Sequence, residues 1–160
     1  MIEKIVLHKL NSILSKIKVA TPSDVDIVTK IMIKLYEGTD FNLLYRENRE
    51  LLSDKKQRVF LCADEEDVII GFAHCSMRYE YVEGTSDGVK GYLEGIYVEK
   101  EYRSQGIGKA LVDNCKFWCK ENGAKEFASD CEINNVESYK FHMELGFEVA
   151  NKIICFKQTI

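Results

Sequence analysis

The sequence has little that would divide it into parts. Its 160 residues contain one proline, and no internal repeat, low-complexity segment or linker interrupts them. A chain of this length is typical of one domain, and its hydrophobic content of 46% is enough for a globular core. We therefore expect a single domain over residues 1–160.

Three further absences exclude classes of protein. No apolar run approaches the roughly 18 residues of a membrane span, and Glu3, Lys4 and His8 interrupt the N-terminus, so it lacks the core of a signal peptide. The net charge of -4 disfavours a nucleic-acid partner, which would need a basic face. None of the six cysteines forms a Cys-x-x-Cys pair. We expect no zinc site, but reduced and mostly buried thiols in a cytoplasmic protein.

Apolar periodicity predicts the order of helices and strands. Residues 1–15 are expected to form a helical extension that packs on its own domain, or else contacts a second copy or a membrane surface. Thr21 and Pro22 start a helix that runs to Tyr36. Further helices are expected at 42–52, 109–121 and 136–145, and strands at 16–20, 58–63, 68–78, 89–98, 127–131 and 147–157, the last as one strand or a hairpin. This order predicts an α/β or α+β sandwich around a mixed sheet.

A glycine-bearing turn, Arg103-Ser-Gln-Gly106-Ile-Gly108, joins the strand at 89–98 to the following helix. It fits neither common nucleotide pattern, because Ala110 replaces the Ser or Thr of a Walker loop and Leu111 replaces the last glycine of the dinucleotide fingerprint. The free amides and the dipole at a helix start bind anions, and glycine allows close approach. The loop therefore predicts a cradle for a pyrophosphate. The alternative is that its glycines only shape a turn.

With its flanking strand and helix, this loop resembles the acyl-CoA pyrophosphate loop of the GNAT N-acetyltransferases. The blocks at 91–98, 127–130, 135–138 and 142–147 resemble, in that order, aminoglycoside 6'-N-acetyltransferases. The resemblance implies a GNAT-like, mostly antiparallel central sheet flanked by helices, and a homodimer. It also implies transfer of an acetyl group from acetyl-CoA to the 6'-amine of an aminoglycoside, by direct attack in a ternary complex, with antibiotic resistance as the outcome.

By this resemblance, the strand backbone at 96–98 pairs with the pantetheine arm like an added strand. Gly95 would permit the bulge that this pairing needs. Asn135 would hydrogen-bond the pantetheine, or else cap its own helix. The residues expected to bind the cofactor are Ile96, Tyr97, Val98, Arg103, Ser104, Gln105, Gly106, Ile107, Gly108, Lys109 and Asn135.

Two acids, Glu94 and Asp130, stand in or directly after otherwise apolar strands. A substrate amine is a cation at neutral pH, and a carboxylate within a strand is costly unless it is paired or hydrated. We expect both acids to bind substrate ammonium groups, with Glu94 accepting the amine's proton directly or through water. The alternative is an ion pair with a lysine or arginine. Tyr79 and Glu80 are expected to form a lip over this cleft, or else part of a charged hairpin.

His142 lies five residues before Phe147, where many GNAT enzymes carry a tyrosine that protonates the CoA thiolate. The aminoglycoside branch is similar to this chain in having histidine there. Because histidine titrates near neutral pH, it could be the general acid, but it could equally be a helix-surface residue or bind the cofactor. A covalent route through Cys131 is less favoured than direct attack.

Two other functions are open. The acceptor could be a polyamine, another small amine or a protein N-terminus, or the chain could be a noncatalytic acyl-CoA-binding module. Mutation of Glu94 and Asp130 would separate these classes, because only an enzyme would lose turnover while it retained its affinity for CoA.

Overall fold

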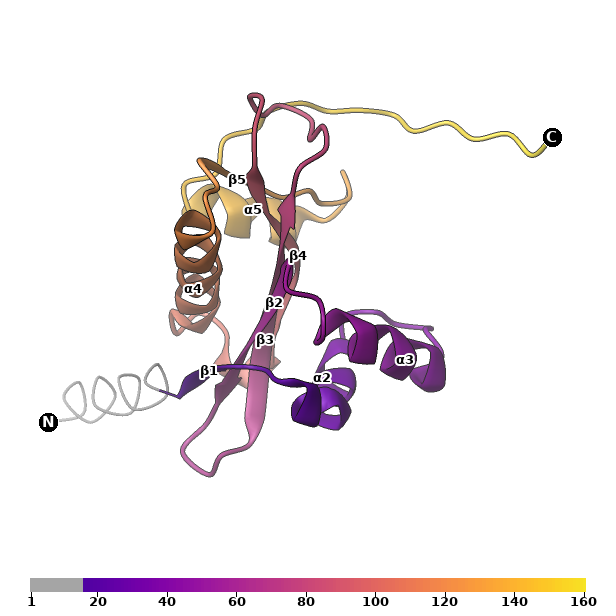
Figure 1. The fold of residues 1–160 in the computed structure, drawn as a ribbon. Coiled ribbons are helices and arrows are strands. Elements are labelled where there is room, and N and C mark those ends of the chain that lie inside the picture. The colour runs from indigo at the N-terminus through magenta and orange to yellow at the C-terminus, as the bar shows by residue number, and fades with distance from the viewer. Residues whose placement is uncertain (1–15) are drawn as a thin grey trace, which may run out of the picture.

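Five strands form one sheet in the order β1-β2-β3-β4-β5 in the computed structural model, which describes residues 16–160 (Figure 1). The first three junctions are antiparallel, and β5 is parallel to β4. A parallel pair needs a crossover, which here contains a helix. The expected mixed, mostly antiparallel sheet is confirmed. Its strands are β1 (Ile17–Val19), β2 (Gln57–Ala63), β3 (Ile69–Arg78), β4 (Lys90–Val98) and β5 (Glu126–Ala128).

Helices cover both faces of the sheet. Figure 1 shows α4 and α5 on one side of the sheet, and α2 and α3 on the other. Successive strand residues point to opposite faces, so β3 supplies Cys75 to the core under α4 and Phe72 to the core under α2. The helices are α2 (Val25–Met32), α3 (Phe41–Leu51), α4 (Ile107–Glu121) and α5 (Val136–Glu144), with single 3-10 turns η1 (Pro22–Asp24) and η2 (Lys100–Tyr102).

The helix predicted to run from Thr21 to Tyr36 is shorter than expected. Its start is confirmed by a capping box at Thr21, but α2 ends at Met32. After it, the amides of Lys34 and Leu35 bond to carbonyls only three residues back, which tightens and turns the chain. A Cβ added to Gly95 of β4 would lie 2.8 Å from the Tyr36 hydroxyl. The early helix end therefore brings Tyr36 over the middle of the sheet.

The strand or hairpin predicted at 147–157 is wrong. Residues 148–160 form neither helix nor strand, and within the described chain they make no backbone–backbone hydrogen bond. Figure 1 shows this segment running away from the body of the molecule. Its apolar side chains are left exposed, with Ile154 at 81% and Phe156 at 91%. The composition favours a strand, but a strand also needs a neighbour to pair with.

The helical extension predicted over residues 1–15 lies outside the described residues. From residue 16 onward, no helix is long and apolar enough to cross a membrane.

Candidate active site

The glycine loop ends at the N-terminus of α4. Gly106 has a φ of 82°, a conformation that glycine adopts without steric cost. The amide of Ala110 donates to the Gly106 carbonyl at 3.0 Å, so the amides of Ile107, Gly108 and Lys109 precede the first helical hydrogen bond. Such a helix start can bind an anion. The pyrophosphate cradle stays a prediction with suitable geometry.

Arg103 and Gly108 fix the loop to its neighbours. The Arg103 Nε donates to the Val98 carbonyl at 2.8 Å, which ties the loop to the end of β4. A Cβ on Gly108 would lie 2.9 Å from the ring of Phe141 on α5. Gly108 is therefore needed for helix packing, whether or not an anion approaches it.

The other predicted loop residues differ in exposure. Ile107 is 1% exposed and anchors α4 in the core. Ser104 and Gln105 are exposed, and the Gln105 amide donates to the carbonyl four residues earlier at 3.0 Å. Lys109 forms an ion pair with Asp113 one turn along the helix.

β4 loses one of its neighbours partway along its length. The β5 ladder covers only residues 90–92, so β4 continues to Val98 without a strand on that side (Figure 1). On the other side Ile96, Tyr97 and Val98 pair with β3. The side chains of Ile96, Tyr97 and Val98 pack against the two cores. This leaves an open backbone edge where the pantetheine arm is predicted.

Glu94 lies at a bulge. Gly95 pairs with His74 and Leu93 pairs with Cys75, so Glu94 has no partner in the β3–β4 register. A bulge redirects the extra side chain. The bulge that the sequence predicts beside Gly95 is present.

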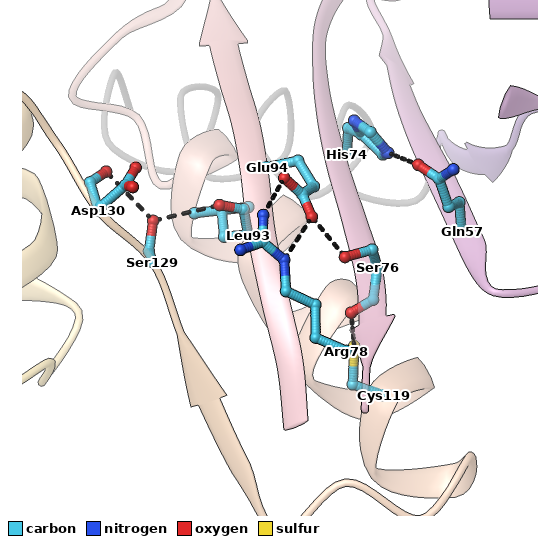
Figure 2. Close-up of polar contacts among 9 residues, drawn as sticks. All are labelled: Gln57, His74, Ser76, Arg78, Leu93, Glu94, Cys119, Ser129 and Asp130. Atoms are coloured by element: carbon cyan, nitrogen blue, oxygen red, sulfur yellow. Dashed lines mark hydrogen bonds and ion pairs between the residues drawn. The ribbon is translucent and has the colours of Figure 1, made fainter. Parts of the chain in front are cut away.

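Both oxygens of the Glu94 carboxylate accept hydrogen bonds in a side-chain network (Figure 2). Ser76 donates to its Oε1, Arg78 Nε donates to Oε1 at 3.1 Å, and Arg78 Nη2 donates to Oε2 at 2.7 Å. The ion pair that the sequence leaves open as an alternative is therefore present. It does not remove Glu94 from the site, since Glu94 also lines a cavity.

Arg78 lies between the two predicted acids. Its guanidinium carbon is 3.4 Å from the centre of the Tyr92 ring, a cation–π contact. Burial and a hydrogen bond with Asp130 raise the pKa of Tyr92 to about 12, so the phenol remains protonated at neutral pH. Asp130 is exposed two residues after the end of β5. Glu94 therefore bonds to Arg78, and Asp130 bonds to the Tyr92 side chain on which Arg78 stacks.

A cavity of about 290 Å³ opens beside Glu94. His74 borders it and is only 8% exposed, with its Nε2 at 2.8 Å from Gln57 Oε1 (Figure 2). Burial lowers the pKa of His74 to about 4, so the ring is neutral at pH 7. The cavity is lined by Asp54, Lys56, Gln57, His74, Ser76, Met77 and Glu94.

Ser76 and Arg78 are site residues that were not predicted from the sequence. The signal was available, because His74, Ser76 and Arg78 alternate along a strand of otherwise apolar residues. Polar residues at this spacing share one sheet face. They lie just beyond the part of that face covered by α2, where a polar side chain can reach a cavity.

Both nitrogens of His142 on α5 have partners. Nδ1 lies 2.7 Å from the Ser138 carbonyl oxygen, and Nε2 lies 2.9 Å from Ser129 Oγ. Asn135 is the N-cap of α5, and its side chain accepts from the Ser138 amide at 2.9 Å. The capping role that the sequence left open for Asn135 is therefore present.

The predicted lip follows β3. Tyr79 is 59% exposed, and Lys56, which lines the cavity, lies with its Nζ 5.1 Å from the ring centre. The Glu80 carbonyl accepts from Lys90 Nζ at 3.3 Å, while the Glu80 side chain is exposed. Within residues 16–160, no group of three or more His, Cys, Asp or Glu side chains could hold a metal ion.

Comparison with known proteins agrees with this geometry. A family model described as "Acetyltransferase (GNAT) family" matches residues 26–147. The chain is similar to the aminoglycoside N(6')-acetyltransferase type 1 of Stenotrophomonas maltophilia, with 31% identity over 144 residues that cover 90% of this chain and 93% of that protein. It is 36% identical over 115 residues to the enzyme of the same name from Acinetobacter baumannii, covering 72% of this chain and 79% of that protein.

Solved structures give the same result. AAC(6')-Iy in complex with the bisubstrate analog CoA-S-monomethyl-acetylneamine superposes with a TM-score of 0.85 at 28% identity, covering 90% of this chain and 97% of that one. The aminoglycoside antibiotic 6'-N-acetyltransferase AAC(6')-Ih from Acinetobacter baumannii has a TM-score of 0.85 at 30% identity, with the same coverage of 90% and 97%.

Proposed function

The chain belongs to the acetyltransferase (GNAT) family, and we propose that it transfers the acetyl group of acetyl-CoA to the 6'-amino group of aminoglycosides. Acetylation removes a positive charge and a donor from the antibiotic, so resistance would be the outcome. The observation that carries the proposal is the similarity, over 90% of the chain, to enzymes named for that reaction. The open β4 edge beside an acid-bordered cavity is the geometry that such a reaction needs.

The glycine loop and the open edge of β4 would hold acetyl-CoA, which supplies an activated thioester. The free amides of Ile107, Gly108 and Lys109 suit a pyrophosphate, because they meet the positive end of the α4 dipole. Arg103 would contribute charge at the loop and keep it joined to β4 through the Val98 carbonyl. The backbone of residues 96–98 would accept the pantetheine arm as an added strand.

Glu94 and Asp130 would attract and orient the cationic acceptor. Glu94 Oε2 accepts one hydrogen bond, from Arg78, and a carboxylate oxygen has two lone pairs. A lone pair is thus left on Oε2 of a residue that lines the cavity. It would accept the proton of the amine through water. Tyr79 and Glu80 would extend the acceptor surface beyond β3.

Direct attack of the amine on the thioester is favoured over a covalent enzyme intermediate. A hydrogen bond with Cys115 and burial raise the pKa of Cys75, and a hydrogen bond with Cys75 and burial raise that of Cys119. These thiols stay protonated and have no access to substrate. Cys131 is exposed, and no base within the described residues is hydrogen-bonded to it.

The test is release of free thiol from acetyl-CoA with kanamycin, tobramycin, spermidine and a short peptide as acceptors. Turnover with kanamycin and tobramycin is expected. Turnover only with spermidine or the peptide would contradict aminoglycosides as the acceptor but would support acetyl transfer to an amine. No turnover with any acceptor, together with measurable acetyl-CoA binding, would replace the enzyme by a noncatalytic acyl-CoA-binding module.

A homodimer in the cytoplasm is part of the same proposal. The apolar residues of segment 148–160 have no cover within the described chain, and such surface usually marks an interface. A second copy could supply the strand partner that the segment lacks. We expect a dimer in sedimentation at micromolar concentration, and a monomer for the double variant Ile154→Asp, Phe156→Asp. A wild-type monomer would contradict the dimer. The cytoplasm fits six cysteines that form no disulfide among the described residues.

A further inference from the structure

The hydrogen-bond partners of His142 determine what its imidazole ring can do. Nδ1 lies nearer to the Ser138 carbonyl oxygen than to the Ser138 Oγ, which is 3.4 Å away. A carbonyl oxygen only accepts hydrogen bonds, so the contact of 2.7 Å with Ser138 requires a proton on Nδ1. The other nitrogen, Nε2, faces Ser129 Oγ at 2.9 Å. The ring therefore has no nitrogen free to meet a third group directly.

Ser129 lies where β4 and β5 separate. The ladder between these strands ends at Ala128, and Ser129 is the next residue. Its Oγ is 3.3 Å from the Leu93 carbonyl oxygen and 3.5 Å from the Asp130 carbonyl oxygen (Figure 2). The hydroxyl thus joins the imidazole ring on α5 to the first residue of the open β4 edge.

The single hydroxyl hydrogen of Ser129 allows two arrangements. When His142 is neutral, Nε2 is an acceptor and the hydroxyl donates to it. When His142 is protonated, Nε2–H donates to Ser129 Oγ, and the hydroxyl hydrogen turns to Leu93. The ring itself is held by edge contacts with Phe147 at 5.0 Å and Phe141 at 5.9 Å. When His142 gains or loses its Nε2 proton, the Ser129 hydroxyl therefore rotates and changes the group to which it donates.

We propose that Ser129 relays the proton of His142 to the open edge of β4, and that His142 serves the reaction only through Ser129. This rests on the proposed acetyl transfer, which releases a thiolate. The Ser129 hydroxyl gives its proton to that thiolate and receives the Nε2 proton of His142. Ser129 is neutral before and after, the imidazolium becomes neutral imidazole, and the thiolate becomes a thiol.

An acid and a base lie near the ring. Asp130 follows Ser129 in the chain, and Lys116 of α4 lies with its Nζ 4.7 Å from the Phe147 ring that packs on His142. The proposed relay rests on the hydrogen bonds of Ser129 with His142 and with the Leu93 carbonyl.

Variants of both relay residues give the kinetic test. Ser129→Ala and His142→Ala should each lower kcat by about 100-fold, a typical contribution of acid–base catalysis. The double variant should be no slower than the slower single variant, because both residues act in one chain of proton transfer. Ser129→Thr keeps a hydroxyl and should recover most of kcat. The Kd for acetyl-CoA should stay within about twofold of wild type throughout.

Other patterns would overturn the relay. If Ser129→Ala keeps wild-type kcat while His142→Ala loses it, His142 acts directly. If both lower only the unfolding midpoint, the pair is structural. The thiolate is common to all acceptors, so the same assay with spermidine or a peptide tests the relay even if aminoglycosides are not substrates. If the wild type turns over no acceptor, the proposed function and the relay both fail.

A readout independent of turnover is the ¹⁵N NMR spectrum of the His142 ring in the free protein. We expect the neutral ring to carry its proton on Nδ1, with an Nε2 shift typical of a hydrogen-bonded acceptor. In Ser129→Ala the Nδ1 proton should persist, because Ser138 still accepts it, while the Nε2 shift moves to that of an unbonded nitrogen. A proton on Nε2 in the wild type, or an Nε2 shift unchanged in the variant, would overturn the assignment.

Discussion

Protonation of His74 should destabilise the folded chain as the pH falls. The ring is 8% exposed, and burial, the largest effect, lowers its pKa from 6.5 to about 4. Glu94 raises this pKa and Arg78 lowers it, so the two nearby charges oppose each other. Below pH 6.5 the unfolded chain takes up a proton on this residue that the folded chain does not. Its contribution to stability is therefore complete above pH 6.5 and is lost as the pH falls toward 4.

The size of the effect follows from the two pKa values. Each pKa unit corresponds to about 1.4 kcal/mol, so His74 should lower the free energy of unfolding by about 2 kcal/mol between pH 7 and pH 5. Urea unfolding at both pH values measures this loss. His74→Gln is the matched variant, because glutamine cannot titrate and can still donate to Gln57. It should show a pH dependence smaller by about 2 kcal/mol. An identical pH dependence in both proteins would refute the reasoning.

Three further substitutions test the packing and the site. Gly91→Ala would place a methyl group 2.6 Å from the Cys119 Cβ. It should lower the free energy of unfolding by about 1–3 kcal/mol, and an unchanged urea midpoint would contradict the close packing. Gly108→Ala should weaken acetyl-CoA binding in calorimetry by displacing Phe141, and adding Phe141→Leu should restore part of the affinity; no recovery would mean that the glycine serves the cofactor alone. Glu94→Gln should raise the KM for aminoglycosides about tenfold through loss of a charged contact, with the Kd for acetyl-CoA unchanged. An equal rise in both would argue against an acceptor role.

Features set by local sequence were predictable. The glycine turn between a strand and a helix depends on a few adjacent residues, and α4 begins directly after Gly106 as the dipole argument requires. The bulge next to Gly95 was expected from the family resemblance, and the β3–β4 register has one there. Each of these features depends on backbone conformations that are set by a few residues adjacent in the sequence.

Pairings set by strand register were not predictable. Arg78 meets Glu94 only because β3 and β4 align across a loop and slip by one residue at the bulge. The sequence leaves a choice of basic partners for Glu94, and register decides among them. The contact of His142 with Ser129 depends in the same way on where β5 ends against α5.

The segment at 147–157 illustrates a different limit. Its apolar residues favour a strand, and the described chain leaves it extended, with Phe156 at 91% exposure. β-propensity describes how well a side chain fits a sheet surface, so it cannot say which chain supplies that sheet. The apolar pattern of this segment therefore cannot distinguish a strand that pairs within the monomer from a strand that forms only when two chains assemble.

The two interruptions of β4 explain how one strand could serve two substrates. On the β3 side, the bulge at Glu94 breaks the ladder and directs a carboxylate to the cavity. On the β5 side, pairing ends at Tyr92 and leaves the following backbone open. Because both breaks fall within residues 93–95, the cavity proposed for the acceptor and the open β4 edge proposed for the pantetheine arm meet at one short segment. Ser129 bonds to the Leu93 carbonyl within that same segment, so a proton presented by its hydroxyl arrives where acetyl transfer would take place.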